Sequence, residues 1–180
     1  MTVPTIARHA TVSTPPGPFT VVVDADADGR DVVVASGWTT DVADLLPVVH
    51  ASLRPAGSDL VGRLPVMDEV EKFFAGDLTA IDEVVVRQRS GPFLQEAWEV
   101  LRTVPAGRPD TYAGFAARCG RPAAVRAAAN ACARNAGALF VPCHRVLGSD
   151  GGLGGFRWGT PVKRWLLDHE AEHAPVPVEA

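Results

Sequence analysis

Residues 111–134 read TYAGFAARCGRPAAVRAAANACAR, and this stretch predicts two short helices joined by a tight turn. The first helix would span residues 111–118, with Gly120 to end it and Pro122 just beyond. The second would span residues 123–134, where seven of the eleven positions from 123 to 133 are alanine, the best helix former. The pattern predicts a helix-turn-helix whose thin second helix can approach a narrow groove of DNA. A helix packed tightly inside the protein is the alternative.

The helical pattern continues on both sides of this unit. Residues 92–104 place their apolar side chains on one helical face, and residues 160–172 predict a last helix with Pro161 in its first turn. Between them, residues 148–155 are rich in glycine and predict a loop.

Before residue 88 the pattern changes to that of a small sheet. Three short β-rich runs lie at residues 7–13, 19–24 and 31–35, and residues 65–74 have the apolar spacing of a helix. We therefore expect an α+β fold with an N-terminal domain and a C-terminal domain. The N-terminal domain would be a small β-sheet plus a helix over residues 1–88, and the C-terminal domain would be helical, with the helix-turn-helix, over residues 89–172. A flexible tail would follow at residues 173–180.

The charges are divided unevenly along the chain. The 180 residues carry a formal net charge of −4, but residues 1–87 hold thirteen acidic and six basic side chains, whereas residues 88–157 hold nine basic and four acidic ones. The second part suits a polyanion, although a chance asymmetry on a solvated surface would look the same.

The hydrophobic content of 47% is ordinary for a globular protein. No apolar run approaches the ~18 residues of a membrane span, so no membrane partner is expected. Three cysteines and an N-terminus without a signal-peptide pattern predict a cytoplasmic location.

Three patterns resemble ligand-binding motifs, but each lacks a feature that the motif requires. Residues 24–29 (DADADG) mimic a calcium-binding loop, but the twelfth position, which must supply a glutamate, is Ala35. The glycines of residues 151–155 lack the Lys-Ser or Lys-Thr of a phosphate-binding loop. Cys119 and Cys132 fit helix faces as small core residues, and the three cysteines show no paired short spacing. The sequence therefore predicts no metal site and no cofactor.

Cys143 lies in the segment LFVPCHRV, residues 139–146, where an apolar strand at residues 139–141 would end at a proline. A cysteine thiol is only about 3% ionised at neutral pH, so a nucleophilic cysteine needs activation. His144 and Arg145 place two potential cations beside it, and a base acting through a water would satisfy the geometry. Taken alone, however, the adjacency of cysteine and histidine favours a buried structural cysteine.

The surrounding sequence changes this interpretation. PCHRV at residues 142–146, followed by GGLGGFRWGTPVKRWLLDHE at residues 151–170, resembles the active-site region of the O6-alkylguanine-DNA alkyltransferases, the methylated-DNA–protein-cysteine methyltransferases. The similarity is specific over residues 90–172 and weaker over residues 8–86. It implies a DNA repair enzyme that transfers the alkyl group, mainly methyl, from O6-alkylguanine in duplex DNA to its own cysteine. The transfer would be irreversible, once per molecule, with the damaged base flipped out of the stack. The implied partner is double-stranded DNA, bound by a monomer.

The resemblance implies a role for each matching residue. Cys143 would accept the alkyl group, His144 would deprotonate it through a water, and Glu170 would orient the imidazole. Tyr112 would hydrogen-bond the extruded guanine, and Asn135 would brace the loop and helix around the site. Without the resemblance, Glu170 would be interpreted as a solvent-facing helix residue and Tyr112 as a half-buried core aromatic.

Two further groups of residues follow from the same resemblance. Arg126 would fill the gap that the flipped nucleotide leaves in the stack. The other residues of the implied DNA-binding surface are Tyr112, Arg121, Ala127 and Ala129. The implied pocket for the base is formed by Val146, Phe156, Arg157 and Trp158.

The sequence departs from the family pattern around this pocket. Ala136 and Ala138 stand where many members have prolines, Phe156 where a tyrosine is common, and Trp158 where a glycine is frequent. We expect the indole beside the bound base, and the two lost prolines, to disfavour benzyl-sized substituents while leaving methyl transfer almost unaffected.

Three other functions are weighed against this one. A non-catalytic sensor of alkylated DNA would lack the acceptor cysteine, so Cys143 argues against it. The PCHR site and the expected minor-groove placement argue against a helix-turn-helix transcription factor. A Cys-His hydrolase would need an oxyanion site or a separate triad, and neither is legible in the sequence.

Overall fold

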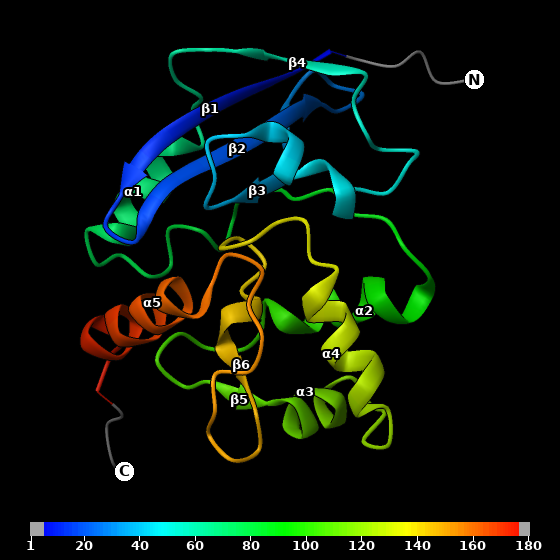
Figure 1. Ribbon diagram of the computed structural model, residues 1–180, viewed down its shortest axis with the longest axis vertical. Coiled ribbons are helices and arrows are strands. Elements are labelled where there is room, and N and C mark those ends of the chain that lie inside the picture. The colour runs from blue at the N-terminus through cyan, green and yellow to red at the C-terminus, as the bar shows by residue number, and fades with distance from the viewer. Residues whose placement is uncertain (1–5, 177–180) are drawn as a thin grey trace.

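The computed structural model describes residues 6–176, in which a sheet layer lies against a helical layer (Figure 1). The sheet has the strand order β3-β2-β1-β4, with β1 and β2 forming an antiparallel hairpin, β3 antiparallel to β2 and β4 parallel to β1. The strands are β1 (Ile6–Thr14), β2 (Gly17–Ala25), β3 (Asp31–Gly37) and β4 (Gly57–Leu60). The three predicted strands are confirmed. The sequence did not predict β4, because its short run GSDL has no apolar alternation.

Both faces of this sheet are covered, which explains the unbroken valines of β2 and β3. Val21, Val23 and Val33 pack with the buried residues of α1 (Met67–Phe74). Val22 and Val34 point the opposite way and pack near the 3-10 helices η1 (Val42–Asp44) and η2 (Leu46–Val48). The expectation of one helix on the sheet was therefore incomplete: α1 starts two residues later than predicted, and η1 and η2 were missed.

Four helices build the other layer: α2 (Pro92–Leu101), α3 (Tyr112–Arg118), α4 (Val125–Ala133) and α5 (Thr160–His173). Thr111 caps α3 by accepting a hydrogen bond from Gly114 N at 3.0 Å, and Gly120 (φ 71°) forms the predicted turn before α4. One face of α4 is buried through Ala128 and Ala131, as the packed-helix alternative required. The two short strands β5 (Asp110–Thr111) and β6 (Val146–Leu147), which pair in parallel beside α3, were not predicted.

The two layers share one apolar core. Leu139, Phe140 and Leu166 pack into the same cluster as the side chains of the sheet and α1. His169 of α5 stacks on Trp165 and its Nε2 lies 2.8 Å from the carbonyl oxygen of Phe73 in α1. The division of the chain at residue 88 stays a prediction.

The C-terminal end of the helical layer differs slightly from the expected one. α5 continues one residue beyond its predicted end, through His173, and residues 177–180 of the predicted tail lie outside the described residues. Between residues 6 and 176, no helix is both long and apolar enough to cross a membrane.

Candidate active site

Cys143 begins the 3-10 turn η3 (Cys143–Arg145) and follows a turn, not a strand. The predicted strand at residues 139–141 is wrong, because residues 138–140 form a turn in which Leu139 has a φ of 74°. The side chain of Asn135 holds both ends of this turn: its Oδ1 accepts from Gly137 N at 3.0 Å and its Nδ2 donates to Val141 O at 2.7 Å. A short apolar run does not by itself distinguish a strand from a buried turn.

Gln88, which no sequence motif singles out, orients the amide of Asn135. Its Nε2 donates to Asn135 Oδ1 at 3.0 Å, while its Oε1 accepts from Ala136 N at 2.8 Å. Because Asn135 Oδ1 receives two N–H groups, its Nδ2 is directed toward Val141 and the Cys143 thiol. Gln88 and Asn135 are 47 residues apart, so no local motif signals this contact.

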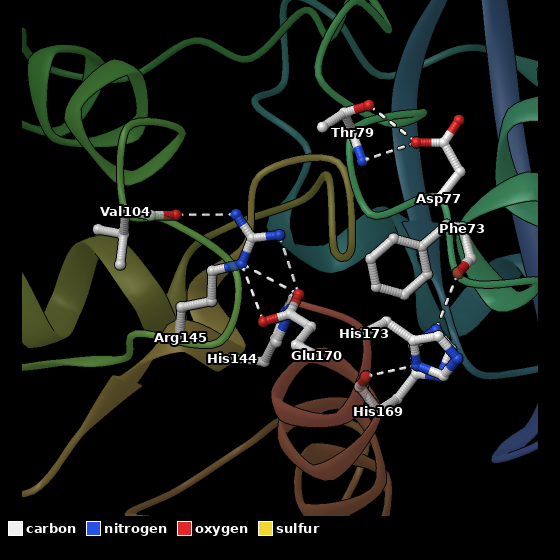
Figure 2. Close-up of polar contacts among 9 residues, drawn as sticks. All are labelled: Phe73, Asp77, Thr79, Val104, His144, Arg145, His169, Glu170 and His173. Atoms are coloured by element: carbon white, nitrogen blue, oxygen red, sulfur yellow. Dashed lines mark hydrogen bonds and ion pairs between the residues drawn. The ribbon is translucent and has the colours of Figure 1, made fainter. Parts of the chain in front are cut away.

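His144 and Arg145, which follow Cys143 in η3, form a buried charged network with Glu170 of α5 (Figure 2). His144 Nε2 lies 2.7 Å from Glu170 Oε1. Arg145 donates to both oxygens of Glu170 from Nε at 3.0 and 3.1 Å, and its Nη1 donates to Val104 O at 2.8 Å. The interpretation of Glu170 as a solvent-facing residue is wrong, since its side chain is fully buried. The expectation of Arg145 as a cation beside the thiol is also corrected, because its guanidinium is paired with Glu170.

This network sets the charges of its members. Burial alone would raise the pKa of Glu170, but the charges and hydrogen bonds of His144 and Arg145 outweigh it and lower the pKa to about 2. Burial lowers the pKa of His144, and because Arg145 already balances the carboxylate, the imidazole is neutral in the resting protein. Its Nε2–H then donates to Glu170. Its Nδ1 is buried and has no hydrogen-bond partner among the described residues, which leaves this nitrogen free to accept a proton.

The Cys143 thiol itself is buried and protonated at rest. Burial raises its pKa, while the Asn135 hydrogen bond and the charge of Lys163 act in the opposite direction. Lys163, also missed by the sequence analysis, is buried on α5 and donates to Val146 O at 2.7 Å and to Leu153 O at 2.6 Å. It thereby fastens the glycine-rich loop to β6.

A cavity of about 450 Å³ opens beside Cys143, within the size range of sites for small ligands. It is lined by residues of α3, α4, the turn and the glycine-rich loop: Tyr112, Ala129, Cys132, Ala133, Asn135, Ala138, Cys143, Gly155, Phe156, Arg157 and Trp158. Most of the expected site residues therefore meet around one cavity. Cys132, which we expected to be a small core residue, lines this cavity.

Several expected residues lie elsewhere. Val146 is fully buried behind the cavity wall, with its carbonyl bonded to Lys163. Ala136 packs against the sheet and not toward the cavity, which corrects the expectation that both alanines shape the pocket. Arg126 and Arg121 are exposed on the outer surface, the latter with its guanidinium 5.3 Å from the ring centroid of Phe93. Ala127 is half-buried on α4.

Comparison with known proteins agrees with this architecture. Residues 92–172 match the family described as 6-O-methylguanine DNA methyltransferase, DNA binding domain. The methylated-DNA–protein-cysteine methyltransferase of Salmonella typhimurium is 35% identical over 162 residues, which cover 88% of this chain and 92% of that protein. The crystal structure of Mycobacterium tuberculosis O6-methylguanine methyltransferase has a TM-score of 0.75 at 29% identity and covers 96% of this chain and 98% of that one. The structure of Mycobacterium tuberculosis OGT in complex with DNA has a TM-score of 0.74 at 28% identity, covering 93% and 95%. The chain belongs to the family of methylated-DNA–protein-cysteine methyltransferases.

Proposed function

We propose that Cys143 is the residue that accepts the alkyl group from O6-alkylguanine in double-stranded DNA. As a member of its family, the chain is a DNA repair enzyme that transfers an alkyl group to a cysteine. The observation that carries the assignment to Cys143 is its place at the wall of the 450 Å³ cavity, directly followed in η3 by His144, which forms a buried pair with Glu170. The acceptor has to be a free thiol, which a reducing compartment such as the cytoplasm maintains. The cytoplasmic location stays a prediction.

In the proposed reaction, His144 takes the thiol proton of Cys143 through a water at its free Nδ1. Glu170 accepts the Nε2–H and stabilises the imidazolium that forms. The thiolate sulfur then attacks the alkyl carbon, so that an S–C bond forms while the C–O6 bond breaks and its electron pair stays with the guanine. The hydroxyl of Tyr112, at the cavity wall, donates to the departing base. The thioether leaves no thiol for a second transfer, so each molecule reacts once.

The exposed side of α3 and α4 is the proposed DNA-binding surface. Arg121 and Arg126 are exposed on this side, and residues 88–157 carry the excess of positive charge. Ala127 and Ala129 keep α4 thin where it would approach the minor groove. The damaged nucleotide would rotate into the cavity and Arg126 would take its place in the stack. All the residues of the proposed site come from one chain, so we propose that a monomer acts.

Mass spectrometry tests the proposal directly. After incubation with an oligonucleotide duplex containing O6-methylguanine, we expect each protein molecule to gain one methyl group, located on Cys143 by peptide mapping. Variants Cys119→Ser and Cys132→Ser, each lacking one of the other two cysteines, should be methylated to the same extent. More than one transfer per molecule, or a methyl group on Cys119 or Cys132, would contradict the assignment.

Arg126→Ala should slow methyl transfer from duplex DNA at least tenfold, while reaction with the free base O6-methylguanine stays near the wild-type rate. The reason is that only the duplex has a stack to be filled. Arg134→Ala, which removes an exposed arginine at the other end of α4, is the control for lost positive charge. Both rate constants can be measured under single-turnover conditions. Equal losses on the duplex and the free base would assign Arg126 a different role.

A further inference from the structure

The indole of Trp158 lies against the backbone of Gly37, the last residue of β3. A Cβ atom at position 37 would lie 2.1 Å from Cζ2, 2.3 Å from Cε2 and 2.7 Å from Cη2 of the indole. Carbon atoms that are not bonded prefer about 3.5–4.0 Å, so no side chain fits there while the indole stays in place. The φ of Gly37 is outside the left-handed region, so the backbone would accept alanine. The three atoms nearest to such a Cβ all belong to the indole, so it is the indole that demands glycine.

Gly37 cannot simply move away from the indole, because its neighbour is tied to the active-site turn. Ser36 N donates to Ala136 O at 2.8 Å, and Ser36 Oγ donates to Ala138 O at 2.8 Å. The end of β3 and the turn before Cys143 are therefore held together. The slot at Gly37 is a fixed feature of the contact between the sheet and the helical layer.

The indole in this slot lies in the walls of two cavities. Trp158 and Arg157 line the cavity beside Cys143, and they also line a second cavity of about 510 Å³ against η1 and η2. The guanidinium of Arg157 lies 5.7 Å from the centroid of the Trp158 ring, and its Nη2 donates to Asp44 O at 3.1 Å. The position of the indole therefore sets the width of the part of the Cys143 cavity that an O6 substituent can enter.

From these contacts we infer that Gly37 is a specificity-determining residue for the alkyl transfer: its missing side chain forms the slot that holds Trp158 at the wall of the Cys143 cavity. The inference rests on the proposed function of Cys143. Gly37 does not line that cavity and acts through the indole, so it is a positioning residue. The N-terminal sheet thus controls which alkyl groups the C-terminal layer accepts, with methyl favoured over benzyl-sized groups.

Four proteins test the inference: the wild type, Gly37→Ala, Trp158→Gly and the double variant. Rate constants are measured with O6-methylguanine duplex and with free O6-benzylguanine, together with thermal melting. Trp158→Gly removes the indole from the wall of both cavities, and we expect this variant to react with the benzylated base about ten- to two-hundred-fold faster than the wild type. Gly37→Ala should slow methyl transfer at least tenfold, because the added methyl group displaces the indole from its slot at the cavity wall. The double variant should match Trp158→Gly within about twofold on both substrates, because the added methyl group then meets no indole.

Gly57→Ala is the matched control, since Gly57 lies in β4 of the same sheet and a Cβ there meets no atom of residues 6–176 within 4 Å. It should leave both rate constants and the melting temperature near the wild-type values. The inference is overturned if Gly37→Ala behaves like Gly57→Ala, or if its loss persists in the double variant. Should Gly37→Ala fail to fold, recovery of the fold in the double variant supports the inference and a second failure overturns it. A wild type that transfers no alkyl group to Cys143 overturns the proposed function instead, and the melting temperatures still report the Gly37–Trp158 contact.

Discussion

Cys143→Ser should abolish methyl transfer while leaving the fold intact. Serine has nearly the shape of cysteine, but its hydroxyl is a much weaker nucleophile than a cysteine thiolate at neutral pH. No other group in the proposed reaction forms a bond to the alkyl carbon. We therefore expect the transfer rate to fall to the background level, a loss of about 10⁴-fold or more, as for other covalent nucleophiles. The measurement is a single-turnover assay with a labelled methyl group on duplex DNA. Binding to the same duplex should stay within about threefold of the wild type.

Cys132→Ser is the matched control, because Cys132 lines the same cavity as Cys143. Burial strongly raises the pKa of the Cys132 thiol, and among the described residues no hydrogen bond joins this thiol to the His144–Glu170 network, so its loss should leave most of the transfer rate. Persistent methylation of the Cys143→Ser protein would move the acceptor role to another residue. A large fall in its melting temperature would show that the thiol is needed for packing as well.

Of all the substitutions proposed for this protein, Glu170→Gln should cause the largest loss of unfolding free energy, and it should also slow methyl transfer. The glutamine keeps the shape of the side chain but removes the charge that balances Arg145, whose guanidinium is buried. Removing one partner of a buried ion pair costs about 3–5 kcal/mol of unfolding free energy. Transfer should also slow, because a neutral amide stabilises the His144 imidazolium less than a carboxylate does. Denaturant unfolding and single-turnover rates measure the two effects.

Glu172→Gln, two residues further along α5 and exposed, is the control and should change neither quantity. The outcome that contradicts the prediction is a Glu170→Gln protein as stable as this control. In that case the buried network would contribute nothing to the folded state.

The same network predicts how stability depends on pH. The pKa of Glu170 in the folded protein is about 2, below the ~4.3 of an unperturbed glutamate. Its ionised form therefore contributes stability above about pH 4.3, and this contribution is lost as the pH falls toward 2. Glu170→Gln should flatten the acid side of the stability profile, measured by denaturant unfolding between pH 6 and 3 in the range where both proteins remain folded. An unchanged acid slope would show that other carboxylates cause it.

Much of the fold was predictable because its signals are local. The apolar spacing of α2 and α5 and the β-rich runs of β1 and β2 are repeated over many residues, so each element is decided within its own segment. The short elements were missed for the same reason. β4, η1 and η2 have too few residues to show a period and exist because the sheet supplies a surface for them.

The sequence by itself determined the family and pointed to Cys143 as the proposed acceptor, because PCHRV and the residues after it stand next to one another in the chain. Only the tertiary structure decided what surrounds that residue. Glu170 is 25 residues from Arg145, and Gln88 is 47 residues from Asn135; each pair meets through hydrogen bonds that no local pattern encodes. Trp158 reaches Gly37 across the contact between the two layers, and there the absence of a side chain decides where the indole lies. A glycine that is needed for its lack of a Cβ gives no hydrophobic pattern in the sequence, because its effect appears only when another part of the folded chain packs against it.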